Sequence, residues 1–539
     1  MNCTLERVSK HSGRTLLIRS LLLAAAVGLS GCAAGPHLVP ENRRNVIDRA
    51  VVEYPNQMIL TPYIGGLTSP CAVAFETEDP DYKGSVLVAE AGVDGDPRVF
   101  GFKPDGTQFW IYPKHAQIPF LSNLYYRIYG PIGGMVVSKG KIYVSHRDKY
   151  GMGVITQFDY NGNHNTVVGD LPAQGDYGVT DLAIHPINGR LYFGVGAATN
   201  SGVVGLDNWE EGWVDDHPEV CDRPLYDIKL NGFRFTTINP KGGLFGGDDI
   251  ANTGPFQKFG ASRQVRIPKS PVGKPTAAIY SVNIEGGDLR VEAHGIRLPR
   301  GLVFNEFGNL FATDNGMEMR GTRPVKDDPD SVLRVPLGAQ IWYGWPDYTA
   351  DLEPVSNQKF QPPQTMIIAT GYPEIAPIID RESSGLVPAD RNQLLRGVFP
   401  ALSGAAKMAL VGDTADEVFK PYRGNVIVAL SGDRAPFANN NQKLVGPQGY
   451  TVKRVDLDTK QVSDFVQNTK RLPQSMIRHS DADALERPID AKFGPDGALY
   501  IVDYGQMIMK HGQERVEPKT GKIFRLGPLN PTTRPSSGQ

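Results

Sequence analysis

Apolar residues in this chain recur as pairs of short runs, each pair joined by a turn that contains Gly or Asp and followed by a polar stop. Short apolar runs rich in Val, Ile, Phe and Tyr are typical of β-strands, and two such runs around a tight turn predict a hairpin. Five segments keep this order: Cys71–Gly92, Gly133–His146, Thr180–Gly196, Arg300–Gly316 and Ile489–Gly505. A weaker sixth copy is Arg423–Asp433.

A third strand with its own turn follows most of these copies. These strands are expected at Arg98–Gly106, Gly153–Gly162, Ser331–Gly338, Thr451–Lys460 and Lys522–Gly527. The repeated unit is typical of a propeller blade, so six copies predict an all-β, six-bladed β-propeller around a central channel. Uneven spacing predicts long loop insertions, chiefly around residues 197–275 and 345–420. A pair of β-sandwiches would also contain many short strands, but the constant internal order of the copies favours the propeller.

The N-terminus has the pattern of an exported protein. Basic residues precede and flank a short apolar run, Leu21–Leu29, which is followed by Ser30, Gly31 and Cys32. A basic region, a short apolar region and small residues indicate a secretory signal, and the run is too short to span a membrane. The Leu-Ser-Gly-Cys ending resembles the bacterial lipobox, in which the Cys is acylated. A plain signal peptide with a chance Cys is the alternative.

These features divide the chain into a lipoprotein signal peptide (residues 1–31), a tether (32–60), the propeller (61–527) and a flexible tail (528–539). Acylation of Cys32 would anchor the protein to a membrane. The expected location is the bacterial cell envelope, at the outer membrane facing the periplasm, because Ala33 follows the Cys as in lipoproteins sent there.

Composition narrows the picture further. The 60 Gly and 42 Pro make the chain rich in turns, and 40% hydrophobic residues provide for a sizeable core. With 56 basic against 58 acidic side chains, nothing in the charge points to nucleic acid. Cys71 and Cys221 remain once the signal and the lipidated Cys are set aside. An oxidising periplasm permits a disulfide between them, and separate burial is equally compatible with the sequence.

Several motifs occur in a fixed order. Residues 295–304 read GIRLPRGLVF, residues 308–316 read GNLFATDNG, and Gly-Trp-Pro follows at 344–346. Near the C-terminus, residues 486–490 read ERPID. This ordered set resembles a signature of the glucose/sorbosone dehydrogenases, and most closely their sorbosone-dehydrogenase-like branch. Members of that family are six-bladed propellers that use pyrroloquinoline quinone (PQQ) and Ca²⁺.

The resemblance implies roles for particular residues. Arg297 and Arg487 occupy positions where the family uses arginine against PQQ, and Arg434 is a looser candidate. The arginine fork suits planar carboxylates, although a surface ion pair would also explain each arginine. Ca²⁺ takes oxygen ligands from irregular loops. Four residues are the implied calcium ligands: Asn315, Gly316, Met317 and Asp330. An acidic loop in solvent is the alternative for Asp330.

The chain departs from the family at two positions. Tyr177 stands where the family has its catalytic His, and Leu298 replaces an Asn beside the PQQ-facing arginine. A phenol with a pKa near 10 is a poor base unless a cation lowers that pKa. Asp176 and Tyr177 are therefore the candidate catalytic residues, with His146 as a further substitute for the lost base.

Three functions follow from these patterns. The leading one is PQQ- and calcium-dependent oxidation of a sugar or aldehyde, with electrons passed to a periplasmic acceptor. The second is a lipid-anchored propeller that binds a ligand without turnover, which the altered residues at 177 and 298 favour. A Ca²⁺-dependent lactone hydrolase is the third and the least supported, because the carboxylates such a site needs are not evident in the sequence.

Overall fold

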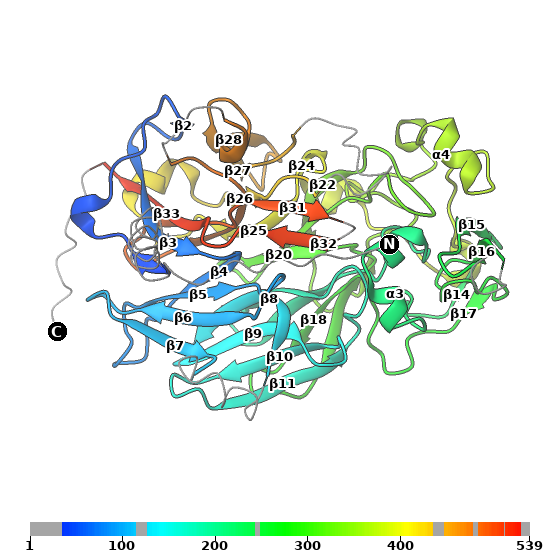
Figure 1. Ribbon diagram of the computed structural model, residues 1–539, viewed down its shortest axis with the longest axis horizontal. Helices are drawn as coiled ribbons and strands as arrows, with labels where there is room; N and C mark the ends of the chain where they lie inside the picture. The colour runs from blue at the N-terminus through cyan, green and yellow to red at the C-terminus, as the bar shows by residue number, and fades with distance from the viewer. Residues whose placement is uncertain are drawn as a thin grey trace, which may run out of the picture.

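The computed structural model describes residues 35–114, 127–242, 248–434, 447–477, 483–510 and 513–529. In this part of the chain, six mainly antiparallel sheets lie side by side (Figure 1). Their innermost strands are β4 (Pro70–Phe75), β8 (Tyr129–Ser138), β12 (Val179–Ile184), β20 (Pro299–Phe304), β25 (Ala405–Leu410) and β29 (Pro488–Phe493). Each of them contacts the next, and β29 contacts β4. The ring is closed, so the prediction of a six-bladed β-propeller is confirmed.

The first three blades follow the chain in order. Outward from its inner strand, blade one continues with β5 (Val86–Glu90), β6 (Arg98–Phe102) and β7 (Gln108–Tyr112). Blade two continues with β9 (Lys141–Arg147), β10 (Gly153–Phe158) and β11 (His164–Leu171). Blade three continues with β13 (Leu191–Val195), β18 (Ala278–Val282), β19 (Arg290–His294) and the parallel edge strand β23 (Ile341–Trp342).

Blade four follows the chain in order, and blades five and six also include strands from the N-terminal part of the chain. Blade four continues with β21 (Leu310–Asp314), β22 (Pro329–Val335) and β24 (Leu395–Ala401). Blade five has β26 (Val426–Leu430), β27 (Thr451–Val455), β28 (Val462–Asn468) and the edge strand β2 (Val52–Glu53). Blade six has β30 (Leu499–Asp503), β33 (Gly521–Pro528), β3 (Met58–Leu67) and the edge strand β1 (His37–Leu38).

The expected tether is built into the propeller from residue 37 onward. Strand β3 begins at Met58 and pairs with β33, so Leu60 lies opposite Leu526 and the two ends of the chain close one blade. Val52, Tyr54, Met58 and Leu60 are buried in the apolar cluster between blades five and six. Burial of these side chains stabilises the edge of the ring, because each large apolar side chain contributes about 1.5–3 kcal/mol. Residues 1–34 and 530–539 lie outside the described residues.

The sixth repeat differs from its prediction. The segment 423–433 contains β26 alone, and its hairpin partner β25 lies inside the expected insertion at 345–420. The sequence of β25 is AAKMAL, which lacks the β-branched and aromatic residues that mark a strand. This segment is extended because it fits between the inner strands of blades four and six, which only the closed ring provides.

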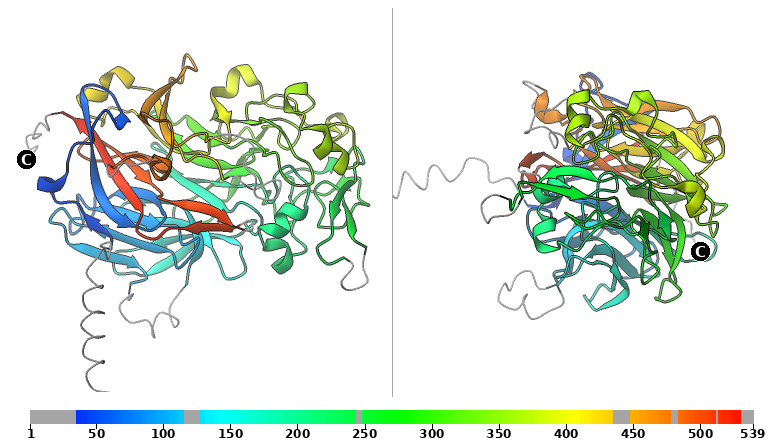
Figure 2. Two further views of the ribbon diagram at one scale, coloured as in Figure 1. Left: turned by 45° about the horizontal axis from the view of Figure 1, so that its top comes forward. Right: turned by 90° about the vertical axis from the view of Figure 1, so that its right-hand side faces the viewer.

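The two long insertions join into one lobe beyond the ring of blades (Figure 2). The first carries α2 (Leu206–Glu210), α3 (Trp213–Asp216), β14 (Ile228–Lys229), β15 (Phe235–Ile238), β16 (Ile250–Thr253) and β17 (Arg266–Ile267). The second carries η3 (Gln358–Phe360), α4 (Gln364–Ala369), α5 (Arg381–Ser384) and α6 (Arg391–Leu394). A β-bridge between Leu230 and Ile379 connects them.

The remaining elements are short. They are η1 (Glu41–Arg43), η4 (Glu417–Tyr422), η5 (Gln474–Met476) and the hairpin of β31 (Met507–Lys510) and β32 (Gln513–Val516). Within the described ranges, no helix has both the length and the apolar character needed to cross a bilayer.

Candidate functional site

A cavity of about 500 Å³ lies where the inner strands of the six blades begin. Each blade contributes wall residues at or near the start of its inner strand, for example Cys71 in β4, Val179 in β12 and Ile489 in β29. Because all inner strands run in the same direction along the channel, their starts meet at one end. Residues hundreds of positions apart therefore share one wall.

The cavity brings together most of the predicted site residues. Those in its wall are Asp176, Tyr177, Arg297, Asn315, Gly316, Asp330, Arg434 and Arg487. Met317 is buried beside the cavity and is not part of the wall. Cys32, the predicted lipidation site, lies outside the described residues. The shared wall establishes proximity for these residues, and their proposed roles depend on the contacts each one makes.

Arg297 is almost completely buried, and its guanidinium is fully used by the protein. Its Nε donates to the Asn200 carbonyl at 2.9 Å, and Nη1 donates to the carbonyls of Gly316 at 2.7 Å and Asn315 at 3.2 Å. Its Nη2 donates to Tyr177 Oη at 2.6 Å and to Asn200 Oδ1 at 2.8 Å. All five N–H groups have acceptors. In this arrangement Arg297 has no donor left for a carboxylate of a ligand.

The predicted calcium loop is occupied by that same guanidinium. The resemblance assigns the carbonyls of Gly316 and Met317 to Ca²⁺. The Gly316 carbonyl accepts a hydrogen bond from Arg297, and so does the neighbouring carbonyl of Asn315. The carboxylate of Asp330 accepts the backbone N–H groups of Gly316 at 3.0 Å and Ala405 at 2.8 Å. Calcium needs six to eight oxygens, and a buried cation already faces the carbonyls of Asn315 and Gly316 in this loop. The residues present do not fit Ca²⁺.

Clusters of side chains that could bind a metal ion are the next feature of the described residues. In the portion of the chain that the structure describes, no group of three or more His, Cys, Asp or Glu side chains is arranged to hold a metal ion.

Tyr177 is held between charged groups. Its Oη accepts from Arg297 and lies 3.3 Å from Glu318 Oε1, to which it donates. Burial raises the pKa of Tyr177, and the guanidiniums of Arg297 and Arg320 oppose that effect without reversing it. A phenol in this environment keeps its proton at neutral pH, which makes it a poor proton acceptor.

Both carboxylate oxygens of Asp176 are also bound by neighbouring side chains. Its Oδ1 accepts hydrogen bonds from Trp213 Nε1 and Asn208 Nδ2, both at 2.8 Å, and its Oδ2 lies 2.8 Å from Arg320 Nη2. The side chain is fully buried. These contacts assign Asp176 a structural part in this arrangement, in which it binds the insertion helices to the propeller.

Arg320 and Glu318 are central residues that sequence reasoning missed. Arg320 forms buried ion pairs with Asp176 at 2.8 Å, Asp207 at 2.5 Å and Glu318 at 3.0 Å. Although burial acts to raise it, the guanidiniums of Arg320 and Arg297 lower the pKa of Glu318 to about 2. Both residues follow closely after the motif that ends at Gly316, and this position in the sequence could have marked them as site residues.

His146 lies away from the cavity wall. Its Nε2 is 2.8 Å from Thr156 Oγ1, and its Nδ1 is 2.6 Å from the Arg147 carbonyl. Burial lowers the pKa of His146 to about 4. His146 is a buried structural residue of blade two, and it is not placed to accept a proton in the cavity.

A second group of arginines lies on the wall formed by blades four to six. Arg487 Nη1 donates to the carbonyls of Asp433 at 2.8 Å and Ser431 at 3.1 Å, and Arg300 Nη1 donates to Ser431 Oγ at 2.9 Å. Arg434 follows in the same turn, with its Nε 3.4 Å from Glu514 Oε1. Burial, and next the charge of Arg434, lower the pKa of Arg300. At Arg434, the charges of Glu514 and Glu211 outweigh burial and raise the pKa. Cationic side chains are in the majority on this wall, where Arg300, Lys407, Arg434 and Arg487 lie with Asp330, Asp433 and Glu514.

The two remaining cysteines are free thiols. Cys71 lies in the cavity wall, and burial raises the pKa of its thiol to about 12. Cys221 is half-buried in the insertion lobe. The possibility of separate burial, which the sequence left open beside a disulfide, is the arrangement in the structure.

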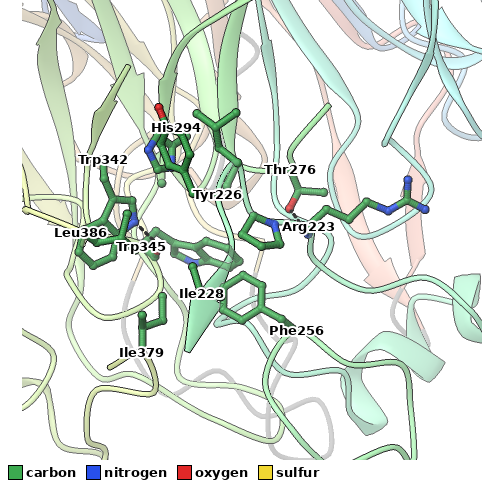
Figure 3. Close-up of a pocket in the computed structure, with 14 residues that line it drawn as sticks. Arg223, Tyr226, Ile228, Phe256, Thr276, His294, Trp342, Trp345, Ile379 and Leu386 are labelled. Atoms are coloured by element: carbon green, nitrogen blue, oxygen red, sulfur yellow. Dashed lines mark hydrogen bonds between the residues drawn. The ribbon is translucent and has the colours of Figure 1, made fainter. Parts of the chain in front are cut away.

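A second hollow lies between blade three and the insertion lobe (Figure 3). Its volume of about 30 Å³ is room for one or two water molecules. Trp342, Trp345 and Phe256 line it, and His294 Nε2 has no hydrogen-bond partner among the described residues. A buried water would satisfy that nitrogen, and the hollow is too small for a sugar.

The first prediction concerns calcium. We expect EDTA-treated protein titrated with Ca²⁺ in a calorimeter to give no saturable binding heat, because Arg297 already occupies the carbonyls of the predicted loop. We also expect the unfolding temperature to be the same in EDTA and in millimolar Ca²⁺. Saturable binding of one ion with a micromolar Kd would contradict this interpretation of the loop.

The second prediction concerns the buried ion pairs. Arg320→Gln should lower the free energy of unfolding by about 3 kcal/mol or more, because it leaves buried carboxylates without a counter-charge. The matched control is Arg290→Gln, since Arg290 pairs with Asp288 while 59% of its side chain is exposed, and its unfolding midpoint should stay close to that of the wild type. Urea unfolding followed by circular dichroism measures both, and equal midpoints would refute the assignment.

Comparison with known proteins gives likenesses of fold. No protein-family model and no curated protein sequence matches the chain. The holo form of the pyranose dehydrogenase PQQ domain from Coprinopsis cinerea is 14% identical, with a TM-score of 0.47, over 90% of this chain and 98% of that one. The PQQ-bound aldose sugar dehydrogenase from Streptomyces coelicolor is 12% identical, with a TM-score of 0.45, over 88% and 99%. A glucose dehydrogenase is 14% identical, with a TM-score of 0.43, over 86% and 98%. At these values the likeness carries no conclusion about activity.

Proposed function

We propose that the cavity binds PQQ, a planar tricarboxylate quinone, and that the protein uses it to oxidise a sugar or an aldehyde. The observation that carries the proposal is the excess of guanidinium groups on the wall of blades four to six. Arg300, Arg434 and Arg487 come from three different blades and meet at one turn, residues 431–434. A polycarboxylate is the class of ligand that such a group of arginines recognises.

Arg487 has the best-prepared donor for this ligand. Its Nη1 is anchored on two backbone carbonyls, and its guanidinium lies 5.0 Å from the centre of the Tyr450 ring. Its Nε is buried and has no hydrogen-bond acceptor within the described part of the chain. A buried donor without an acceptor costs about 1–3 kcal/mol, and a ligand carboxylate would remove that cost.

Bound PQQ would supply the electrophile that accepts hydride from the substrate. The residues of this chain would orient it: Arg300 and Arg487 would hold its carboxylates, and the buried walls would limit the access of water. Lys407 reaches the same wall and donates to the Cys71 carbonyl. Calcium has no part in this proposal, because its implied loop is occupied by Arg297. The proposal includes a periplasmic electron acceptor as the partner of this oxidation.

The third prediction tests the cofactor site. Arg487→Gln should weaken PQQ binding about 10–100-fold, because it removes a charge-assisted contact worth about 1.5–3 kcal/mol. Equilibrium dialysis in EDTA, with PQQ absorbance as the readout, measures the Kd. Arg471→Gln is the matched control, since Arg471 is 64% exposed and lies outside the cavity wall. Absence of PQQ binding to the wild type, or equal Kd values for wild type and Arg487→Gln, would refute the proposal.

A second candidate function is ligand binding without turnover. It is favoured by Tyr177, whose hydroxyl is fixed between a guanidinium and a carboxylate. One experiment distinguishes the two functions. The protein is loaded anaerobically with PQQ and mixed with a redox dye and a panel of sugars and aldehydes, and reduction of the dye supports the enzyme. Bound PQQ that no member of the panel reduces supports the binding protein.

The location of the protein is also part of the proposal. We expect lipid on Cys32 to hold the mature protein at the cell envelope, since two acyl chains are sufficient for stable anchoring. The fourth prediction is that the wild type partitions with membranes and that Cys32→Ser is released into the soluble fraction. Fractionation of a host with intact lipoprotein processing tests this, and soluble wild-type protein would contradict it.

A further inference from the structure

Glu211 differs from the other carboxylates of the cavity wall. Asp176, Glu318 and Asp330 are bound by arginines or backbone N–H groups, and Glu514 lies against Arg434. The carboxylate of Glu211, in contrast, receives no hydrogen bond and no ion pair from the described residues, and it lines the same wall. Among the described residues it is therefore a wall carboxylate that remains available to a ligand.

The backbone around Glu211 holds it firmly in place. Glu211 directly follows α2, and its N–H donates to the carbonyl of Asp207 in the first turn of that helix. Gly212 follows with a φ of 94°, and α3 begins at the next residue. Asn208 and Trp213, on either side of Glu211, both donate to Asp176 at 2.8 Å. The junction of the two helices is thus bound to the propeller, and a residue at this junction can be presented precisely to the cavity.

The charges around Glu211 are of both signs. The guanidiniums of Arg434 and Arg320 favour its ionised form, and the carboxylates of Asp176 and Glu318 oppose it. Arg147, from blade two, also faces it electrostatically. Burial is the largest effect, and together these groups raise the pKa of Glu211 to about 8. A carboxyl in this range can exchange its proton near neutral pH.

We infer that Glu211 accepts the hydroxyl proton of the substrate in this cavity, an assignment that rests on the proposed function. In the balanced step, the O–H bond breaks and its proton passes to a carboxylate oxygen of Glu211. The C–H bond on the same carbon breaks with its electron pair, which leaves as hydride to the quinone oxidant. A C=O bond forms, so the substrate loses two electrons and two hydrogens and becomes a carbonyl compound.

This inference accounts for the altered position 177. Tyr177 and Asp176 were the sequence candidates for the base, and both are held by strong contacts to arginine. Glu211 comes from the insertion between β13 and β18, which the repeat pattern does not describe. In this inference the proton acceptor is a residue of the insertion, and Tyr177 is a hydrogen-bond partner of Arg297.

The fifth prediction compares Glu211→Gln with Glu210→Gln, a neighbour of the same chemistry whose side chain is exposed and outside the wall. Glu211→Gln should lower kcat about 100-fold or more and leave the Kd for PQQ within about threefold. Glu210→Gln should stay within about twofold of the wild type, and Glu211→Asp should recover part of the loss. Only ionised Glu211 can accept the proton, so kcat/KM of the wild type should rise with pH and level off above about 8, whereas that of Glu211→Gln should not.

A readout independent of turnover completes the test. Infrared difference spectra of wild type minus Glu211→Gln, without cofactor, should show a protonated carboxyl that disappears as pH rises through about 8. A group that titrates near the ordinary value of about 4, or full activity in Glu211→Gln, would overturn the inference alone. Wild-type protein that binds PQQ but oxidises nothing would overturn the proposed oxidation and the inference with it.

Discussion

The guanidinium of Arg297 is the contact on which the site depends. It is bound to Asn200 from one insertion, to Tyr177 from blade three and to the loop after β21 in blade four. A single buried cation thereby joins three separate segments at the end of the channel. It also fixes the electrostatics of the wall, because a second cation is repelled from the carbonyls that Arg297 already uses.

This constraint divides the cavity into two sides. On one side, Arg297 and Arg320 are neutralised by Asp176, Asp207 and Glu318, and these residues form a closed, buried network. On the other side, Arg300, Lys407, Arg434 and Arg487 lie with the fewer carboxylates Asp330, Asp433 and Glu514, and burial lowers the pKa of Arg300. The first side is rigid scaffold, and the second is the surface where an anionic ligand gains the most. Glu211 lies in the same wall, within the electrostatic reach of Arg434.

The insertions matter because they complete this wall. Residues 197–275 leave blade three between β13 and β18 and return to it, so the ring is not interrupted. Asp176 accepts hydrogen bonds from two residues of this insertion, which attaches α2 and α3 to the propeller. Asp176 also forms a buried ion pair with Arg320. Buried ion pairs contribute little net stability relative to apolar packing, and this one positions side chains at the cavity.

The repeat of apolar runs determined most of the fold, since blade hairpins depend on local patterns of strand and turn that are written in consecutive residues. The motifs around Arg297 and Arg487 both lie at the cavity, and the roles that the sequence suggested for them stay predictions. The sequence could not determine β25, because AAKMAL becomes a strand only between two other blades. It also could not determine that Arg297 would use every donor internally, or that Glu211 would lack a hydrogen-bond partner among the described residues. Those outcomes depend on which charges meet across blades, and the partners of a buried charge are chosen by tertiary packing among residues far apart in the chain.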